Sequence, residues 1–342
     1  MTTEIKVMIY GIGAIGSRIA KLALKKKGIV VVGAVDLAEE KVGKDLGEVL
    51  GVGKVGVTIT DEAEELFSRI EADIVLHATR SYLREVYDQI MLCVESGFNL
   101  ISTCEELAYP WIKHPQLASE IDGAAKISGV TVLGTGINPG YLMDTLPILL
   151  TGMCGEVKSI EVVRAIPVLR RRLPFQKKVG VGMKSEEFME KLKSGEITGH
   201  VGFTESIAMI AAALGWKLDE IRELPPEPII AEREIETPHF KIKPGEMLGH
   251  VAGAQGFMNG KPVITLKFIA HAGVEEGYNE YVIEGKPTIK IRTSEVLGDW
   301  ETAHVVINMI PRVLNARPGL LTMKDLPLPS AMLGDARLFL EW

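Results

Sequence analysis

The chain has 342 residues, a formal net charge of -7 and 46% hydrophobic residues. This length predicts two domains, with ample apolar material for two cores. The acidic balance and the lack of a Lys/Arg-rich arm argue against nucleic acid as a partner. Cys93, Cys104 and Cys154 show no CxxC spacing, so we expect reduced thiols. No apolar run reaches the ~20 residues that span a bilayer, and the first residues are too polar for a signal peptide, so we expect a cytoplasmic protein with no membrane partner.

Strand-like and helix-like segments alternate through the first part of the chain. Helical spacing appears at 17–26, 62–70 and 82–96 and from residue 115 onward. Such alternation predicts parallel strands joined by right-handed crossovers, here as a Rossmann-type domain over residues 1–140. The strands are expected at 5–10, 29–35, 73–78, 99–102 and 130–133.

The pattern changes after about residue 140. Helical segments at 185–194 and 204–214 interrupt several longer strand-like runs, which predicts a second, α+β domain with a mixed or antiparallel sheet over residues 141–301. A helix at 302–314 and the segment up to 342 are expected to pack back on the first domain. The strand-like runs are 157–166, 228–240, 250–256, 263–270 and 280–291.

A glycine motif, GxGxxG, follows the first predicted strand and opens the first helix. Gly11 permits a tight turn, Gly13 lets the backbone approach a pyrophosphate, and Gly16 lets helix and strand pack closely. The free N–H groups of the helix N-terminus suit phosphate groups. With Asp36 placed 20 residues after Gly16, the motif predicts an NAD or NADP site. The whole motif, Gly11, Ile12, Gly13, Ala14, Ile15 and Gly16, is expected to line it.

Asp36 ends the second predicted strand. Its carboxylate should bond the ribose hydroxyls and repel a 2′-phosphate, so we expect NAD to be preferred over NADP. Lys41 and Lys44 lie nearby in the sequence and leave some use of NADP open. The alternative is that Asp36 only caps a following helix.

Three further loops follow strands and are expected at the same sheet edge, where ligands of open α/β sheets bind. After the third strand, Arg80 either reaches phosphate or substrate or is a surface charge. At the junction between the domains, the Asn138 amide suits a nicotinamide carboxamide or a substrate, although a hinge without ligand contacts is the alternative. The expected cofactor contacts from these loops are Ala78, Thr79, Arg80, Thr103, Asn138 and Pro139.

Two adjacent carboxylates follow the fourth strand. Because neighbouring side chains of an extended segment diverge, we expect Glu105 to point inward as an acid/base group and Glu106 to start a helix or be solvated. The alternative is that both are solvated. Apolar neighbours such as Tyr109 and Trp111 would raise the pKa of a buried Glu105.

The second domain offers cationic and polar side chains. An arginine cluster could hold a substrate carboxylate, although such a run is more often a solvated face. The isolated histidines lack metal-ligand spacing, so no metal site is expected. The arginines are Arg164, Arg170, Arg171 and Arg172, the histidines His200, His250 and His271; the expected substrate contacts are Glu105, Asn138, Arg164, Arg170 and His271.

Five stretches resemble the 2,4-diaminopentanoate dehydrogenase family, which includes native amine dehydrogenases and is distantly similar to dihydrodipicolinate reductases. They are GIGAIG, VLHATRSYL, NLISTCEELAYPW, GTGINPGYLMDTLP and INMIPRVLNARPGLLTMKDLP. The resemblance implies NAD(P)-dependent, reversible oxidative deamination, foremost of 2,4-diaminopentanoate to 2-amino-4-oxopentanoate and ammonia. It also implies that Glu105 handles the amine proton. The arginines, His271 and Asn279 favour an amino-acid substrate, and we expect a homodimer or higher homo-oligomer.

Four other functions stay open at this point. The chain could act on simple ketones and amines, or reduce a cyclic imine as dihydrodipicolinate reductases do, although it lacks their His-His pair. It could be a regulator that senses NAD, which the presence of Glu105 disfavours. It could also be an aldehyde-type dehydrogenase with Cys104 as the nucleophile, but no paired histidine is evident nearby.

Overall fold

The computed structural model describes residues 4–171, 173–197, 199–237 and 239–340, without the side chain of Pro174. The chain divides into two compact units. Unit 1 consists of Met1–Tyr141 and Leu297–Trp342, and unit 2 consists of Leu142–Val296. The sequence placed these divisions after residue 140 and before residue 302.

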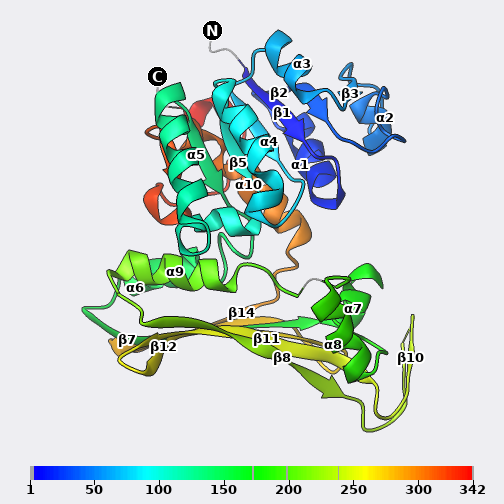
Figure 1. The fold of residues 1–342 in the computed structure, drawn as a ribbon, viewed down its shortest axis with the longest axis vertical. Helices are drawn as coiled ribbons and strands as arrows, with labels where there is room; N and C mark the ends of the chain where they lie inside the picture. The colour runs from blue at the N-terminus through cyan, green and yellow to red at the C-terminus, as the bar shows by residue number, and fades with distance from the viewer. Residues whose placement is uncertain (1–3, 172, 198, 238, 341–342) are drawn as a thin grey trace. The chain divides into compact units, whose positions relative to one another are not determined.

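Unit 1 is built on a seven-stranded sheet in the order β15-β6-β5-β4-β1-β2-β3 (Figure 1). All its strand pairs are parallel. The predicted parallel sheet of a Rossmann-type domain is therefore confirmed. The strands are β1 (Ile5–Tyr10), β2 (Ile29–Val35), β3 (Ile59–Thr60), β4 (Ile74–His77), β5 (Asn99–Ser102), β6 (Thr131–Gly134) and β15 (Gly319–Leu321).

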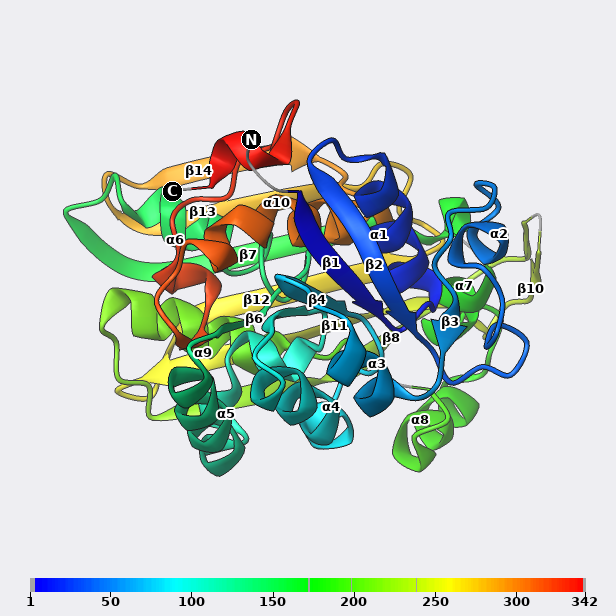
Figure 2. The same ribbon diagram turned by 90° about the horizontal axis from the view of Figure 1, so that it is seen from above.

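Helices cover both faces of this sheet (Figure 2). One face carries α1 (Ala14–Lys25) and α10 (Asp299–Leu314), which are joined by an ion pair of 3.1 Å between Arg18 and Asp299. The strands are accordingly buried almost throughout, as expected of a parallel sheet. The other face carries α3 (Ala63–Arg69), α4 (Leu83–Glu95) and α5 (Pro115–Ser128). The short α2 (Leu46–Leu50), which the sequence analysis did not predict, follows β2.

Unit 2 contains a six-stranded sheet in the order β14-β13-β7-β12-β11-β8. The pair β7–β12 is parallel and the other pairs are antiparallel, which confirms the predicted mixed sheet. A separate two-stranded ribbon pairs β9 with β10. The strands are β7 (Glu156–Pro167), β8 (Glu220–Ile230), β9 (Ile235–Glu236), β10 (Lys241–Ile242), β11 (Met247–Met258), β12 (Lys261–His271), β13 (Tyr278–Lys286) and β14 (Ile289–Ser294).

Two predicted strands of unit 2 were wrong in their limits, and proline explains both. The strand expected at 228–240 lies at Glu220–Ile230, because its prolines are tolerated on the edge strand β8, which has one neighbour. The run expected at 280–291 is a hairpin of β13 and β14 that is interrupted at Pro287. The helices of unit 2 are α6 (Thr145–Thr151), α7 (Leu173–Lys178), α8 (Ser185–Ser194) and α9 (Phe203–Leu214).

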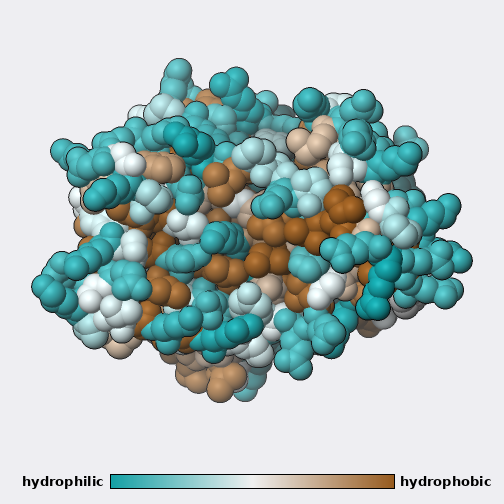
Figure 3. Space-filling model, turned by 90° about the horizontal axis from the view of Figure 1, so that it is seen from below, coloured by the Kyte–Doolittle hydropathy of each residue, from teal (hydrophilic) through white to brown (hydrophobic). Residues whose placement is uncertain are grey.

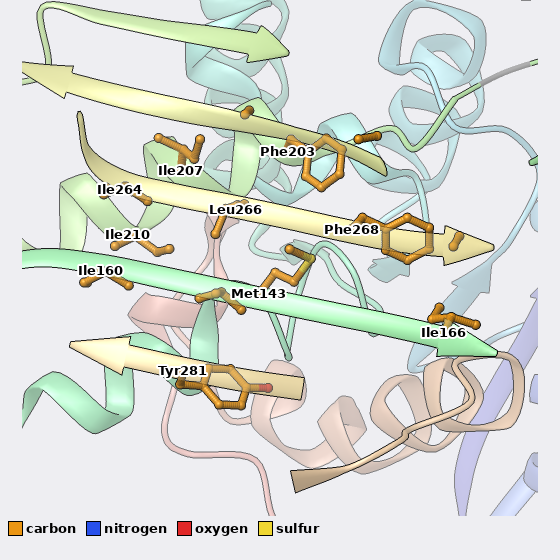
Figure 4. Close-up of a cluster of buried hydrophobic side chains, with 14 of the residues drawn as sticks. Met143, Ile160, Ile166, Phe203, Ile207, Ile210, Ile264, Leu266, Phe268 and Tyr281 are labelled. Atoms are coloured by element: carbon orange, nitrogen blue, oxygen red, sulfur yellow. The ribbon is translucent and has the colours of Figure 1, made fainter. Parts of the chain in front are cut away.

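The core of unit 2 lies between the sheet and helices α6 and α9 (Figure 4). Alternate residues of β12, Ile264, Leu266 and Phe268, point into it and meet Ile207 and Ile210 of α9. We call this the inner face of the sheet. Period-two alternation then places the intervening residues on the opposite, outer face.

The outer face of the sheet mixes apolar and charged side chains. Val163, Val251 and Ile269 are partly exposed there, and Lys267 forms an ion pair of 2.8 Å with Glu161 of the neighbouring strand. Figure 3 shows the molecule from below relative to Figure 1. Apolar side chains gather near the middle of this view, and hydrophilic side chains surround them.

Among the helices of the described residues, none combines the length and the apolar character needed to cross a membrane. Cys93, Cys104 and Cys154 are all unpaired thiols. The cytoplasmic location remains a prediction.

Gly134, the last residue of β6, tests how tightly unit 1 is packed. A Cβ atom at Gly134 would lie 2.3 Å from the carbonyl carbon of Leu107, so we expect Gly134→Ala to lower the free energy of unfolding by about 1–3 kcal/mol. At Gly123 in α5 a Cβ atom would meet nothing within 4 Å, so Gly123→Ala should raise it by about 0.5–1 kcal/mol. Urea unfolding followed by circular dichroism measures both, and equal stabilities of the two variants would contradict this packing.

Candidate functional site

The strand order of unit 1 reverses between β1 and β4, and such a switch point is where open α/β sheets bind ligands. Gly11 follows β1 with φ +91°, a backbone conformation that favours glycine. A Cβ atom at Gly11 would lie 2.4 Å from the carbonyl oxygen of Ala78, which follows β4. Glycine therefore lets the two loops meet at the switch point.

The other two glycines of the motif differ in their surroundings. A Cβ atom at Gly16 would lie 1.8 Å from the Gly11 carbonyl oxygen, so Gly16 allows α1 to pack closely on the loop. Gly13 has open space where its Cβ would be, as a backbone that a pyrophosphate approaches requires. Gly13 is the N-cap of α1, and no side chain caps this helix. Ala14 is exposed and Ile15 is partly exposed. The first N–H groups of the helix are therefore suited to bind phosphate.

Asp36 is tied to the glycine loop. Its carboxylate accepts hydrogen bonds from the backbone N–H groups of Ile12 at 2.6 Å and Ala38 at 2.9 Å. The Lys41 ammonium lies 3.2 and 3.3 Å from the two carboxylate oxygens and 3.1 Å from the Ile12 carbonyl oxygen. Burial raises the pKa of Asp36, but these N–H bonds and Lys41 outweigh it and hold the pKa below its ordinary value. Asp36 caps no helix, because the next helix, α2, is capped by Asp45.

The loops that follow the strands are joined by backbone hydrogen bonds at one edge of the sheet. The N–H of Ala78 donates to Tyr10 at 2.8 Å, that of Thr103 to His77 at 3.0 Å, and that of Thr135 to Ser102 at 2.9 Å. Each donor is the first residue after a strand, and each acceptor is the last carbonyl group of the neighbouring strand. The loops with Thr79, Glu105 and Asn138 are thereby held side by side, whereas the side chain of Arg80 is exposed.

Glu105 and Glu106 begin a short 3-10 helix, Glu105–Ala108, and differ in their surroundings. Glu105 is partly exposed. Glu106 was expected to start a helix or to be solvated; it does lie in the first turn of this helix, but it is not solvated. Glu106 is buried, and one carboxylate oxygen lies 2.8 Å from both the backbone nitrogen of Leu83 and Nε2 of His114. It therefore satisfies an N–H group at the start of α4.

An aromatic pair and a buried thiol also lie close to this segment. Tyr109 and Trp111 pack against each other with ring centroids 5.2 Å apart. Burial raises the pKa of the Cys104 thiol, and its Sγ contacts the carbonyl oxygen of Ser81. A buried thiol with a raised pKa is a poor nucleophile, which disfavours an aldehyde-type dehydrogenase with Cys104 as the nucleophile.

The junction after β6 holds two buried acceptors that suit a cofactor amide. Among the described residues, no hydrogen-bond partner is found for Oγ1 of Thr135 or Oδ1 of Asn138. A Cβ atom at Gly140 would lie 2.7 Å from Oγ1 of Thr135, so the loop folds tightly around it, with Pro139 buried. Together with Gly13 and Asp36, these atoms fit a nicotinamide dinucleotide laid along the edge of the sheet.

The inner face of the unit 2 sheet contains a group of polar side chains that the sequence analysis did not bring together. Arg164 of β7 is buried and donates to the Val296 carbonyl oxygen at 2.6 Å. Phe268 lies opposite Arg164 on β12 and stacks on the His200 ring with a centroid distance of 5.2 Å. Burial, Arg164, Lys178 and His250 lower the pKa of His200 to about 3, so it is neutral.

The other predicted contacts of unit 2 do not join this group. Arg170 is exposed, Arg171 lies 3.9 Å from Glu295, and Arg172 lies outside the described residues. His271 follows the inward-pointing Ala270, so alternation along β12 places His271 on the outer face, away from the side of Arg164. The three histidines are far apart along the chain, so no sequence pattern indicated that His200 and His250, rather than His271, lie on the side of Arg164.

Comparisons with known proteins agree with these observations. Residues 141–342 match the family described as 2,4-diaminopentanoate dehydrogenase C-terminal domain, and residues 5–104 match dihydrodipicolinate reductase, N-terminus. The 2,4-diaminopentanoate dehydrogenase of Acetoanaerobium sticklandii is 39% identical, over 98% of this chain and 96% of that protein. An amine dehydrogenase of Streptomyces virginiae is 25% identical, over 96% of this chain and 98% of that protein.

A solved structure of an amine dehydrogenase from Mycobacterium smegmatis is also similar. It has a TM-score of 0.83 and 28% identity, and the match covers 97% of this chain and 98% of that one. The predicted class of enzyme, an NAD(P)-dependent dehydrogenase acting on amines, is confirmed by these relatives. Family match and whole-length identity together show that the chain belongs to the 2,4-diaminopentanoate dehydrogenase family.

Proposed function

We propose that the protein oxidatively deaminates 2,4-diaminopentanoate to 2-amino-4-oxopentanoate and ammonia, in a reaction that also runs as reductive amination. The observation that carries this proposal is the row of loops at the carboxyl edge of the unit 1 sheet. There, backbone bonds hold the Glu105 segment between the loop that follows β4 and the Asn138 junction, in a chain 39% identical to a 2,4-diaminopentanoate dehydrogenase.

The chemistry needs a base in two places. The substrate ammonium must lose a proton before its C–H bond can yield hydride, and a nicotinamide cofactor, when bound, would supply the hydride acceptor. Water then adds to the resulting iminium carbon, and ammonia leaves as the carbonyl forms. Glu105, partly exposed at the start of its 3-10 helix, is suited to accept the first proton and release it to solvent, and then to deprotonate the water and return that proton to the departing ammonia.

Arg164 is the cation of unit 2 that we propose for the substrate carboxylate. Its guanidinium is buried on the inner face and the nearby His200 is neutral, so a carboxylate would gain a charge-assisted bond in surroundings of low dielectric. The exposed Arg170 lacks this advantage. His271, on the outer face, is a weaker candidate than the sequence suggested.

Glu105→Gln and Arg164→Met test the two halves of this proposal. Glu105→Gln removes the base, so kcat for NADH formation from 2,4-diaminopentanoate should fall about 10²–10⁴-fold while NADH binding persists. Arg164→Met removes the carboxylate partner, so KM for 2,4-diaminopentanoate should rise about 10–100-fold, with little change for an alkyl diamine that has no carboxylate. The absorbance of the NADH formed at alkaline pH measures both kcat and KM.

The matched controls are Glu95→Gln and Arg233→Met, which remove exposed charges and should keep wild-type kinetics. Wild-type turnover of simple amines alone would move the protein to the ketone-aminating branch of the family. Silence of the wild type toward all amines, with NADH still bound, would refute oxidative deamination and favour an imine reductase or a sensor.

We also propose that NAD is preferred over NADP, with Lys41 limiting the preference. Asp36 would bond ribose hydroxyls and repel a 2′-phosphate, but the Lys41 ammonium within 3.3 Å neutralises part of that charge. The same ammonium is within reach of a phosphate that replaces the hydroxyl.

Asp36→Ser and Lys41→Ala should therefore shift the cofactor preference in opposite directions. Asp36→Ser should weaken NADH binding and favour NADPH, and Lys41→Ala should weaken NADPH binding, each by about tenfold. Fluorescence titration with NADH and NADPH measures both, with the exposed Lys44→Ala as control. An unchanged ratio in Asp36→Ser would remove Asp36 from the ribose site.

A homodimer or higher homo-oligomer is proposed through the outer face of the unit 2 sheet. Partly exposed apolar side chains that gather on one face of a sheet are typical of an interaction surface. The face carries charges of both signs side by side in Lys267 and Glu161, so it can complement a second copy across a two-fold axis.

Sedimentation velocity should then show a species of at least twice the mass of the chain. Ile269→Glu buries a charge at the proposed interface and should shift this species toward the monomer, whereas Lys261→Glu, exposed at the start of β12, should not. A wild-type monomer, or a dimer unaffected by Ile269→Glu, would exclude this face.

A further inference from the structure

His77, the last residue of β4, is a fully buried polar side chain for which the chemistry above has no use. Its Nδ1 lies 2.8 Å from Oγ of Ser102 at the end of β5, and its Nε2 lies 2.8 Å from Oε1 of Gln89 on α4. Oγ1 of Thr79 lies 2.9 Å from the same Nε2 and donates to Gln89 at 2.8 Å. One imidazole thus bridges the ends of two strands.

The donors and acceptors of this network assign one tautomer. Oε1 of Gln89 is an acceptor only, so Nε2 of His77 and the Thr79 hydroxyl both donate to it. Nδ1 is then an acceptor, and the Ser102 hydroxyl donates to it. Ser102 Oγ accepts in turn from the backbone N–H of Cys104 at 3.1 Å.

The imidazole stays neutral in this setting. Burial lowers the pKa of His77 to about 4, although the bond to Gln89 opposes this shift. The ring of Tyr10 packs edge-on against it at a centroid distance of 5.4 Å, and burial raises the pKa of that tyrosine to about 12. Neither group ionises near neutral pH, so the directions of the hydrogen bonds are fixed.

Each side of the network reaches a different part of the site. Thr79 belongs to the loop after β4 that is expected to line the cofactor. Ser102 holds the N–H of Cys104, the residue directly before Glu105. We propose that His77 is a positioning residue that sets the Thr79 loop and the Glu105 segment relative to each other, an inference that rests on the proposed function.

The two sides can be separated by experiment. Thr79→Val should weaken NADH binding about tenfold with little change in kcat, and Ser102→Ala should lower kcat about tenfold with NADH binding within twofold of wild type. His77→Leu should show both effects. In the Thr79→Val background, His77→Leu should weaken NADH binding by less than a further twofold, because that side of the network is already broken.

Thr131→Val is the matched control. Thr131 is buried at the opposite end of the sheet, where its hydroxyl bonds the Arg317 carbonyl oxygen, so its loss should lower the melting temperature and leave NADH binding and kcat unchanged. If His77→Leu does not fold, His77→Gln replaces it. Thr79→Val and Ser102→Ala then test the two sides of the network separately.

Two results would overturn the proposal. One is a folded His77→Leu enzyme with NADH dissociation constant and kcat within twofold of wild type. The other is a full tenfold effect of His77→Leu on NADH binding in the Thr79→Val background. The NADH titration is independent of substrate, so failure of the proposed deamination would appear in turnover alone and leave the binding test readable.

Discussion

The carboxyl edge of the unit 1 sheet depends on one constraint, that backbone N–H groups buried where strands end must find acceptors. Ala78, Thr103 and Thr135 meet it by donating to the last carbonyl groups of neighbouring strands. The sheet therefore extends its hydrogen bonding beyond its strands. A glycine turn, a carboxylate segment and an amide junction, distant in sequence, are aligned by bonds that any residue type can make.

In unit 2, the alternation of side chains along the strands separates the inner face of the sheet from the outer face. The inner face of its sheet is apolar along most of β12, and Arg164 interrupts that pattern on the neighbouring β7. A buried guanidinium is costly unless anions or carbonyl groups meet it, and here the Val296 carbonyl oxygen meets part of that need. Polar residues on an otherwise apolar face thus indicate ligand recognition more directly than the exposed run at Arg170.

The fold was largely predictable because its signals are local. The glycine motif, the alternation of strands and helices, and the position of Asp36 all lie within short windows, and they gave the parallel sheet. The strand β15 was not predicted because its three residues are too few to show the two-residue alternation that indicates a strand. His200 and His250 were set aside as isolated because their neighbourhood with Arg164 arises only when strands and loops distant in sequence pack together. The burial of Glu106 was not predicted because its partners, Leu83 and His114, are brought to it only by tertiary packing.

The adjacent glutamates of the STCEEL stretch are not interchangeable copies. Glu106 is committed to the start of α4 and to His114, so it cannot replace its neighbour when Glu105 is changed. A one-residue shift of this segment would exchange the surroundings of Glu105, the proposed base, with those of Glu106. Redesign of the enzyme for new amines must therefore preserve the length of the segment between Ser102 and Leu107.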